Sequence, residues 1–235
     1  MESKQDMEED TTTQTHTTPP LIGGAGRGAA LVVCLIFFLG LAIDQAIKIW
    51  VKTSFTLHES LHITDWFQLV FIENNGMAFG MELFDKIFLT GFRLVATLAL
   101  AVYISRQIKK GVRWAYLICL SFIMTGAAGN IIDCVLYGQI FSQSTPFTPA
   151  ELVPIGQGAG EWFYGKVVDM FYFPLAEWTW PDWLPIIGGS HYLFFSYIFN
   201  FADACITCGV IALILFCRKE LSSEMNNKKL DENEQ

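Results

Sequence analysis

The sequence predicts an all-α membrane protein with four transmembrane helices, a small β-rich platform on the outer side, and an extended outer insertion between the third and fourth helices. Hydrophobic residues make up 52% of the chain and charged residues only 16%, whereas soluble domains carry roughly 25% charged residues. The apolar residues are also gathered into long runs, as in proteins that cross a lipid bilayer.

Four apolar runs are each close to the about 20 residues that a helix needs to cross a bilayer. Their approximate bounds are 29–51, 87–105, 114–137 and 197–217. We expect helices because lipid offers the backbone no hydrogen-bond partners. Together the runs define one membrane domain, 29–218. The flanking segments 1–28 and 219–235 are polar and poor in aromatic residues, so we expect disordered tails there.

Lys and Arg residues are concentrated at three places that flank these runs. Arg27 precedes the first run, the loop 106–113 joins the second to the third, and Arg218 follows the fourth. With four helices, these places share one side of the membrane, which the positive-inside rule assigns to the cytoplasm. Both termini are then cytoplasmic, and the segments 52–86 and 138–191 face outward.

The outward segments predict the platform. Residues 67–72 form an apolar run that is too short for a membrane helix, and we expect a strand of a small sheet there. The later outward segment is rich in Trp and Tyr, which favour the boundary between lipid and water. We therefore expect the platform to lie at the membrane surface.

Polar side chains fall at one depth in the predicted helices, close to their outer ends. Those on the same helix are spaced by three or four residues, so they share a helix face. The residues are Asp44, Lys48, Arg93, Asn130, Asp133, Asn200 and Asp203. A carboxylate inside a membrane costs roughly 2.5–3.5 kcal/mol on insertion scales and usually serves a function. We expect these side chains to form one site with Asp169 of the outer segment.

Each polar residue also has a simpler interpretation. Asp44 and Lys48 alone are typical of a structural ion pair, and Asn130 and Asn200 of hydrogen bonds between helices. The small residues 126–129 favour close helix packing. A transporter or a non-catalytic scaffold would also use buried polar residues, although transporter sites favour the bilayer midplane and repeated halves.

Several classes of site are not expected. The His residues are scattered, so the spacing supplies no convergent ligand set and we expect no metal. The six Cys residues lie in or near apolar runs, unlike the disulfide framework of a small secreted domain. No basic stripe indicates a nucleic-acid partner.

Five blocks, in order, resemble lipoprotein signal peptidase, also called signal peptidase II, a family of bacterial membrane aspartic proteases. The resemblance covers about residues 40–218. The blocks are Asp44-Gln45-Ala46-Ile47-Lys48, Asn74-Asn75-Gly76-Met77-Ala78-Phe79-Gly80, Gly126-Ala127-Ala128-Gly129-Asn130-Ile131-Ile132-Asp133, Val167-Val168-Asp169-Met170-Phe171 and Phe199-Asn200-Phe201-Ala202-Asp203.

This resemblance implies that Asp169 and Asp203 are a catalytic pair that activates water without a metal or cofactor. The reaction would remove the signal peptide of diacylglyceryl-modified prolipoproteins, cutting just before the lipidated cysteine. Two carboxylates held close together share a proton, so one can act as base and the other as acid. The supporting residues that the resemblance implies are Asp44, Lys48, Asn74, Gly76, Asn130, Asp133 and Asn200.

The resemblance also implies a bacterial cytoplasmic (inner) membrane location, a periplasmic platform, contact with membrane lipid, a monomer, and inhibition by globomycin-type cyclic peptides. The sequence departs from the family in two ways. Cys134 stands where the family usually has Arg, so we expect that contact either to be lost or to be supplied by Arg93 or Lys166. The stretches 142–165 and 174–190 are longer than usual, and we expect them to thicken the platform.

Overall fold

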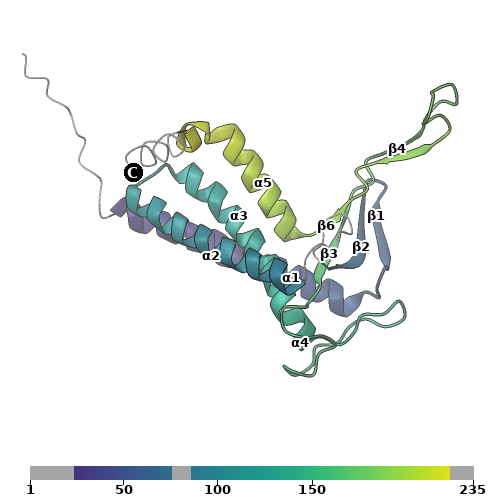
Figure 1. Cartoon of the computed structure of the whole chain (residues 1–235), viewed down its shortest axis with the longest axis horizontal. Coiled ribbons are helices and arrows are strands. Elements are labelled where there is room, and N and C mark those ends of the chain that lie inside the picture. The colour runs from purple at the N-terminus through teal and green to yellow at the C-terminus, as the bar shows by residue number, and fades with distance from the viewer. Residues whose placement is uncertain (1–23, 76–85, 223–235) are drawn as a thin grey trace, which may run out of the picture.

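The helices gather at one end of the molecule and the strands at the other in the computed structural model, which describes residues 24–75 and 86–222 (Figure 1). The long helices are α1 (Gly24–Ser54), α2 (Lys86–Lys110), α3 (Trp114–Ile132) and α5 (Phe201–Phe216). Helix α3 continues as a π-helix, η2 (Asp133–Tyr137), and a short α4 (Gly138–Ile140). The remainder of both predicted tails lies outside the described residues.

The described parts of the predicted tails are helical. Helix α1 begins at Gly24 instead of residue 29, and Gly28 in its first turns lies close to the Trp114 ring. At the other end of the chain, residues 218–222 form a further helical turn after α5. The prediction of disorder is therefore wrong for these two short segments.

Among the described residues, three helical segments are long and apolar enough to cross a membrane: Gly26–Ser54, Lys86–Lys110 and Trp114–Ile140. Helix α5 is apolar but has 16 residues. It begins at Phe201 and not at residue 197 as predicted, because Ile198–Phe199 form strand β6 and Asn200 caps the helix.

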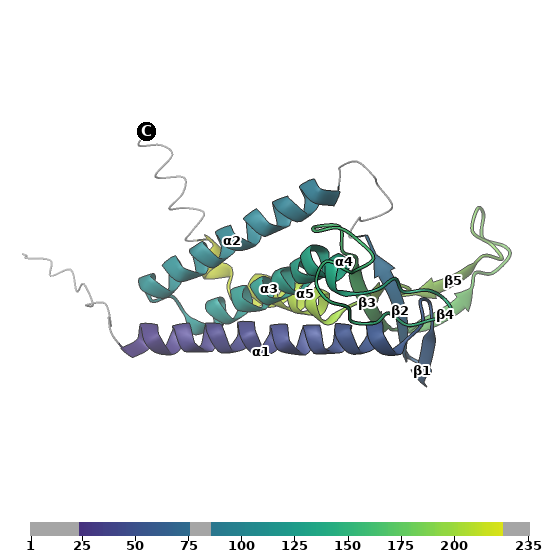
Figure 2. The same cartoon turned by 90° about the horizontal axis from the view of Figure 1, so that it is seen from below.

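Helix α3 lies at the centre of the helical part, where it packs against α1, α2 and α5 (Figure 2). Its contact with α5 is close because small residues line it. A Cβ atom added at Gly126 would lie 2.1 Å from the carbonyl oxygen of Ala202. The small residues 126–129 thus have the close-packing role that the sequence predicts for them.

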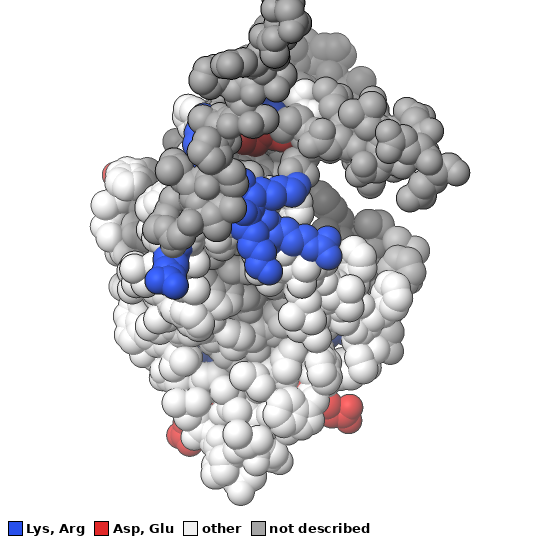
Figure 3. Space-filling view, turned by 90° about the vertical axis from the view of Figure 1, so that its left-hand side faces the viewer, with Lys and Arg blue, Asp and Glu red and all other residues white. Residues whose placement is uncertain are grey.

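Basic side chains gather at the end of the molecule opposite the sheet (Figure 3). The exposed residues there are Arg27, Arg106, Lys109, Lys110, Arg113, Arg218 and Lys219. Arg113 also donates to the carbonyl oxygen of Phe216 at 2.9 Å, which ties the start of α3 to the end of α5. The three basic places expected from the sequence therefore lie together.

A four-stranded antiparallel sheet covers the other end of the helices, in the order β1-β2-β3-β6. Its strands are β1 (Ser60–Thr64), β2 (Phe67–Asn74), β3 (Val167–Tyr172) and β6 (Ile198–Phe199). Strand β2 confirms the strand predicted at 67–72. Buried Phe71 and Met170 pack against Val51 of α1. This packing holds β3, which carries Asp169, against the ends of the helices.

The first long outer stretch, 142–165, folds back onto the end of α3. Its backbone N–H groups donate to carbonyl oxygens of η2 and α4, including Gly165 to Cys134 at 2.8 Å and Gly160 to Gly138 at 2.8 Å. A Cβ at Gly165 would lie 2.1 Å from the carbonyl oxygen of Asp133, so only glycine permits this approach. The segment thus supports the π-helical turn that begins at Asp133.

The second long stretch forms a separate hairpin. Strands β4 (Ala176–Thr179) and β5 (His191–Phe194) pair with each other and extend sideways from the end of the four-stranded sheet (Figure 1).

We predict that Gly126→Ala destabilises the chain, because the new methyl group would push α5 away from α3. Overpacking of this kind typically costs about 1–3 kcal/mol. The matched control is Gly91→Ala in α2, where an added Cβ meets nothing within 4 Å. Thermal unfolding of both full-length variants in detergent, followed by circular dichroism, measures the difference. Equal midpoints would contradict the close packing.

Candidate active site

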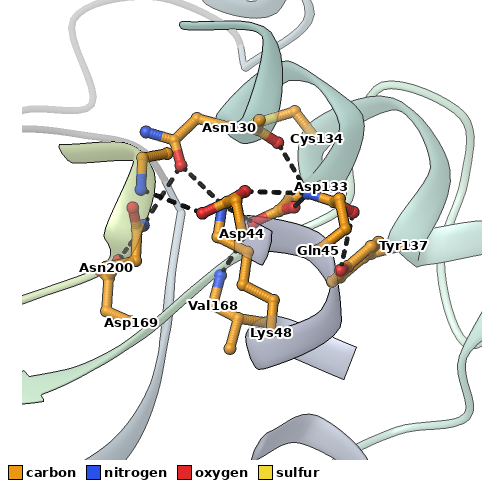
Figure 4. Close-up of polar contacts among 12 residues, drawn as sticks. Asp44, Gln45, Lys48, Asn130, Asp133, Cys134, Tyr137, Val168, Asp169 and Asn200 are labelled. Carbon is orange, nitrogen blue, oxygen red and sulfur yellow. Dashed lines mark hydrogen bonds and ion pairs between the residues drawn. The ribbon is translucent and has the colours of Figure 1, made fainter. Parts of the chain in front are cut away.

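Lys48 is the centre of a buried polar network between α1 and α3 (Figure 4). Its ammonium nitrogen lies 3.0 Å from Asp44 Oδ2 and 2.8 Å from Asp133 Oδ2, and it donates to Asn130 Oδ1 at 2.9 Å. The Lys48 side chain is 0% exposed. All three ammonium protons can therefore be bound, and the cation joins two helices as well as pairing with Asp44 on its own helix.

The two carboxylates beside Lys48 extend the network to the sheet and to α5. Asp44 Oδ1 accepts the backbone N–H of Ala202 at 3.0 Å, in the first turn of α5. Asp133 Oδ2 accepts the backbone N–H of Val168 at 3.3 Å, in strand β3. A Cβ at Gly129 would lie 2.5 Å from Asp44 Oδ2, so this glycine makes room for the carboxylate.

Gln45 and Tyr137 belong to the same network, although neither was among the predicted site residues. Gln45 Nε2 donates to Asp133 Oδ1 at 3.1 Å, and its Oε1 accepts the Tyr137 hydroxyl at 3.0 Å. Gln45 stands inside the first of the five sequence blocks, which could have singled it out. No sequence signal marks Tyr137, because its contact depends on how α3 continues into η2.

Asn200 organises the start of α5. Its side-chain oxygen accepts the backbone N–H of Asp203 at 2.9 Å, as an N-cap residue does, and Asp203 completes the reciprocal capping box. Its side-chain amide donates to Asp169 Oδ1 at 2.6 Å and to Asn130 Oδ1 at 3.2 Å. One amide side chain thus contacts the carboxylate of Asp169 and the backbone of Asp203.

Asp169 and Asp203 are each bound by one of two asparagines, Asn200 and Asn130, which also contact each other. Asp169 also accepts from Asn74 Nδ2 at 3.2 Å, and Asp203 Oδ1 accepts from Asn130 Nδ2 at 2.8 Å. Asp169 is buried, whereas Asp203 is half-buried. Burial, and then the nearby charge of Asp203, raise the pKa of Asp169 to about 7. A carboxyl group with this pKa can hold or release a proton near neutral pH.

A second polar cluster lies next to Asn74. Glu73 of β2 pairs with Lys52 of α1 and accepts from Lys166 at 3.0 Å and from Ser144 at 2.8 Å. Burial opposes ionisation of Glu73, but the charge of Lys52 and these hydrogen bonds outweigh burial and bring its pKa below the usual value. The cluster therefore fixes β2 to α1 and to the 142–165 stretch, one residue from the amide that binds Asp169.

The structure places Arg93 beside Cys134, where the family resemblance expects an arginine. Arg93 Nη1 lies 3.9 Å from the Cys134 sulfur, whereas Lys166 binds Glu73 instead. The predicted site residue Gly76 lies outside the described residues. Within 24–75 and 86–222, no three His, Cys, Asp or Glu side chains converge as metal ligands would.

Comparisons with known proteins converge on one family. A family model described as signal peptidase (SPase) II matches residues 36–218. A lipoprotein signal peptidase of Porphyromonas gingivalis is 47% identical over 200 residues, which span 84% of this chain and 88% of the relative. One of Amoebophilus asiaticus is 33% identical over 208 residues, which span 84% and 82%.

A solved structure supports the fold. It is described as a bacterial membrane enzyme determined by the in meso method at 2.3 Å resolution. It is 24% identical to this chain, matches it with a TM-score of 0.54, and the match covers 82% of this chain and 90% of the solved one.

We predict that Lys48→Met destabilises the chain strongly, because it leaves the Asp44 and Asp133 carboxylates buried without their cation. Breaking a buried ion pair in this way typically costs about 3–5 kcal/mol. Lys109→Met, at the exposed end of α2, is the matched control. Unfolding midpoints in detergent compare the two variants, and a Lys48→Met protein as stable as its control would show that the network does not hold the helices.

Proposed function

This chain belongs to the signal peptidase II family, and from that premise we propose that it removes the signal peptide of diacylglyceryl-modified prolipoproteins with Asp169 and Asp203 as its catalytic pair. It is an aspartic-type peptidase of a bacterial membrane. The relatives named lipoprotein signal peptidase make a lipid-modified precursor the substrate class to test.

The observation that carries this proposal is the convergence of Asp169 and Asp203 on Asn130 and Asn200. Within the described residues, Asp169 comes from the strand β3 and Asp203 from the helix α5. The Asn200 amide donates to the Asp169 carboxylate, the Asn130 amide donates to the Asp203 carboxylate, and Asn200 also donates to Asn130. Both carboxylates accept hydrogen bonds from amide groups, and within residues 24–75 and 86–222 neither forms an ion pair with a lysine or arginine. A scaffold that only held helices together would not need a carboxyl group with a pKa raised to about 7 at Asp169.

In this proposal the two carboxyl groups share one proton and titrate as a unit. Burial of Asp169 favours its uncharged form, so the shared proton resides mainly on Asp169 in the free enzyme. The ionised Asp203 then takes a proton from the attacking water as general base. Protonated Asp169 polarises the scissile carbonyl and later supplies a proton to the leaving amine.

The remaining predicted residues have supporting parts. Asp44, Lys48 and Asp133 hold the ends of α1, α3, α5 and β3 in register, so that the two aspartates keep their geometry. Asn74 positions Asp169 directly. With Gly76 it would also line the substrate groove, where glycine lets the backbone approach a bound peptide closely.

We further propose that α5 crosses the membrane as a fourth span, with residues 218–222 extending it. The basic end of the bundle would then face the cytoplasm, together with both termini, by the positive-inside rule (Figure 3). The sheet and the aspartates would lie at the periplasmic face of the inner membrane. There a precursor anchored by its acyl chains can approach laterally from the lipid. A monomer contains every residue of this site, and a globomycin-type cyclic peptide would compete for the same groove.

We predict that Asp169→Asn and Asp203→Asn each abolish cleavage of a diacylglyceryl-modified precursor, because either change removes one half of the acid and base pair. The exposed Asp65→Asn variant, at the edge of the sheet, should keep full activity. Cleavage is measured on electrophoretic gels with purified full-length protein, and circular dichroism checks that each variant is folded. Retained turnover in either site variant would end the assignment.

The same assay should be run with precursor that lacks the diacylglyceryl group. The proposed enzyme should refuse it, and equal cleavage of both precursors would indicate a general signal peptidase instead.

We predict that cleavage declines as the pH rises through about 7, where the proton held by Asp169 is lost. Because the hydrogen bond from Asn74 lowers the pKa of Asp169, Asn74→Ala should move this decline to higher pH. The measured quantity is the midpoint of the alkaline limb, and not the absolute rate. A midpoint that stays in place or moves to lower pH would contradict the role of Asn74.

The stability of the folded chain should also depend on pH, through the protonation of Asp169. The pKa of Asp169 is raised above the ordinary value of about 4, so between these pH values the folded chain holds a proton that the unfolded chain has released. Its contribution to stability is therefore present at low pH and is lost as the pH rises through about 7. The Asp169→Asn variant should lack this component.

A further inference from the structure

The β4–β5 hairpin has one aromatic face and one charged face. Paired residues of a two-stranded ribbon share a face, and residues alternate between faces along each strand. The pairs Trp178 with Tyr192 and Ala176 with Phe194 lie on one face. The pairs Glu177 with Leu193 and Thr179 with His191 lie on the other, where Leu193 is the apolar member. The Trp178 and Tyr192 rings are 4.8 Å apart, whereas His191 contacts Glu177 at 2.6 Å on the opposite side.

The loop at the end of the hairpin continues the apolar character of the aromatic face. Trp183 is 78% exposed and Ile186 is 103% exposed. Large apolar side chains this exposed are uncommon in contact with water, and a contiguous group of them indicates a surface that meets another apolar phase.

The position of the hairpin indicates which phase this is. The hairpin starts near β6, where α5 meets the sheet, and extends obliquely away from the helical bundle (Figures 1 and 2). Exposed Phe195 and Tyr197 connect it to β6, and exposed Ile211 and Ile214 of α5 follow. Exposed apolar residues therefore occur in the hairpin, in the link to β6 and, after the largely buried start of α5, in the later turns of the helix that we propose as a membrane span.

We propose that the aromatic face and the tip of this hairpin bind the lipid surface of the outer leaflet. Trp and Tyr are the residues that favour the headgroup layer, and an element with one apolar and one polar face lies in the plane of that layer. The hairpin acts as a lateral support that holds the sheet, and with it Asp169 on β3, at a fixed height above the lipid. This inference rests on the membrane arrangement in the proposed function, but not on the catalytic roles of the aspartates.

The hairpin can be tested with a photoreactive amino acid in the full-length chain. p-Benzoylphenylalanine replaces Trp178 or Trp183 on the apolar side, and Thr179 as the matched control on the charged face. Exposed Phe92 on α2 is the positive control for lipid contact. Each variant is reconstituted in vesicles of phosphatidylethanolamine and phosphatidylglycerol, irradiated, and analysed by mass spectrometry for an added lipid mass.

Positions 178 and 183 should acquire several-fold more lipid than position 179, at a level comparable with position 92. Equal labelling at 178 and 179, or none at 178 and 183 while 92 reacts, would overturn the proposal. So would adducts to a second protein chain in place of lipid, because they would assign the hairpin to a protein partner. Cleavage in the same vesicles is scored separately, so that failure of the lipid contact and failure of the catalytic assignment can be distinguished.

Discussion

The site depends on a buried ammonium group. Lys48 binds Asp44, Asp133 and Asn130 with no exposure to solvent, and removal of such a cation would leave two carboxylates without compensation in an apolar surrounding. Because Asp44 also holds the start of α5 and Asp133 also holds β3, the same charge cluster fixes every element that carries an aspartate of the proposed pair. A change in helix spacing would break several of these contacts together.

The carboxylates of the site have two kinds of partner, a cation or amide groups. Asp44 and Asp133 are ion-paired with Lys48 and join the helices as structural partners. Asp169 is bound by the amides of Asn74 and Asn200, which orient it without supplying a full positive charge. Burial and the neighbouring Asp203 can then raise the pKa of Asp169 to about 7. In the proposed function, this difference between charge-paired and amide-bound aspartates lets Asp169 exchange a proton near neutral pH.

Much of this arrangement could be predicted from the sequence, because it follows from local patterns. Apolar length predicted the helices, and the spacing of Asn130 to Asp133 and of Asn200 to Asp203 predicted side chains on shared faces. The start of α5 could not be predicted, since Ile198 and Phe199 are apolar and become a strand only because β3 offers a partner. The roles of Tyr137 and of the Glu73 cluster depend on contacts between segments that are distant in the sequence, which no local pattern reveals. The sequence indicates that the two outer stretches are long, but it does not indicate their structures. Only the fold shows that one packs on the end of α3 and the other forms an exposed hairpin.

In the proposed function, the network leaves one exchangeable proton on the Asp169 and Asp203 pair. Infrared spectroscopy of the full-length protein in lipid nanodiscs can detect that proton through the carbonyl stretch of a protonated carboxyl group. We predict a band that is present at acidic pH, disappears with a midpoint of about 7, and is missing from the Asp169→Asn variant. A band that is absent from the unmodified protein at acidic pH, or that persists unchanged in the variant, would contradict it.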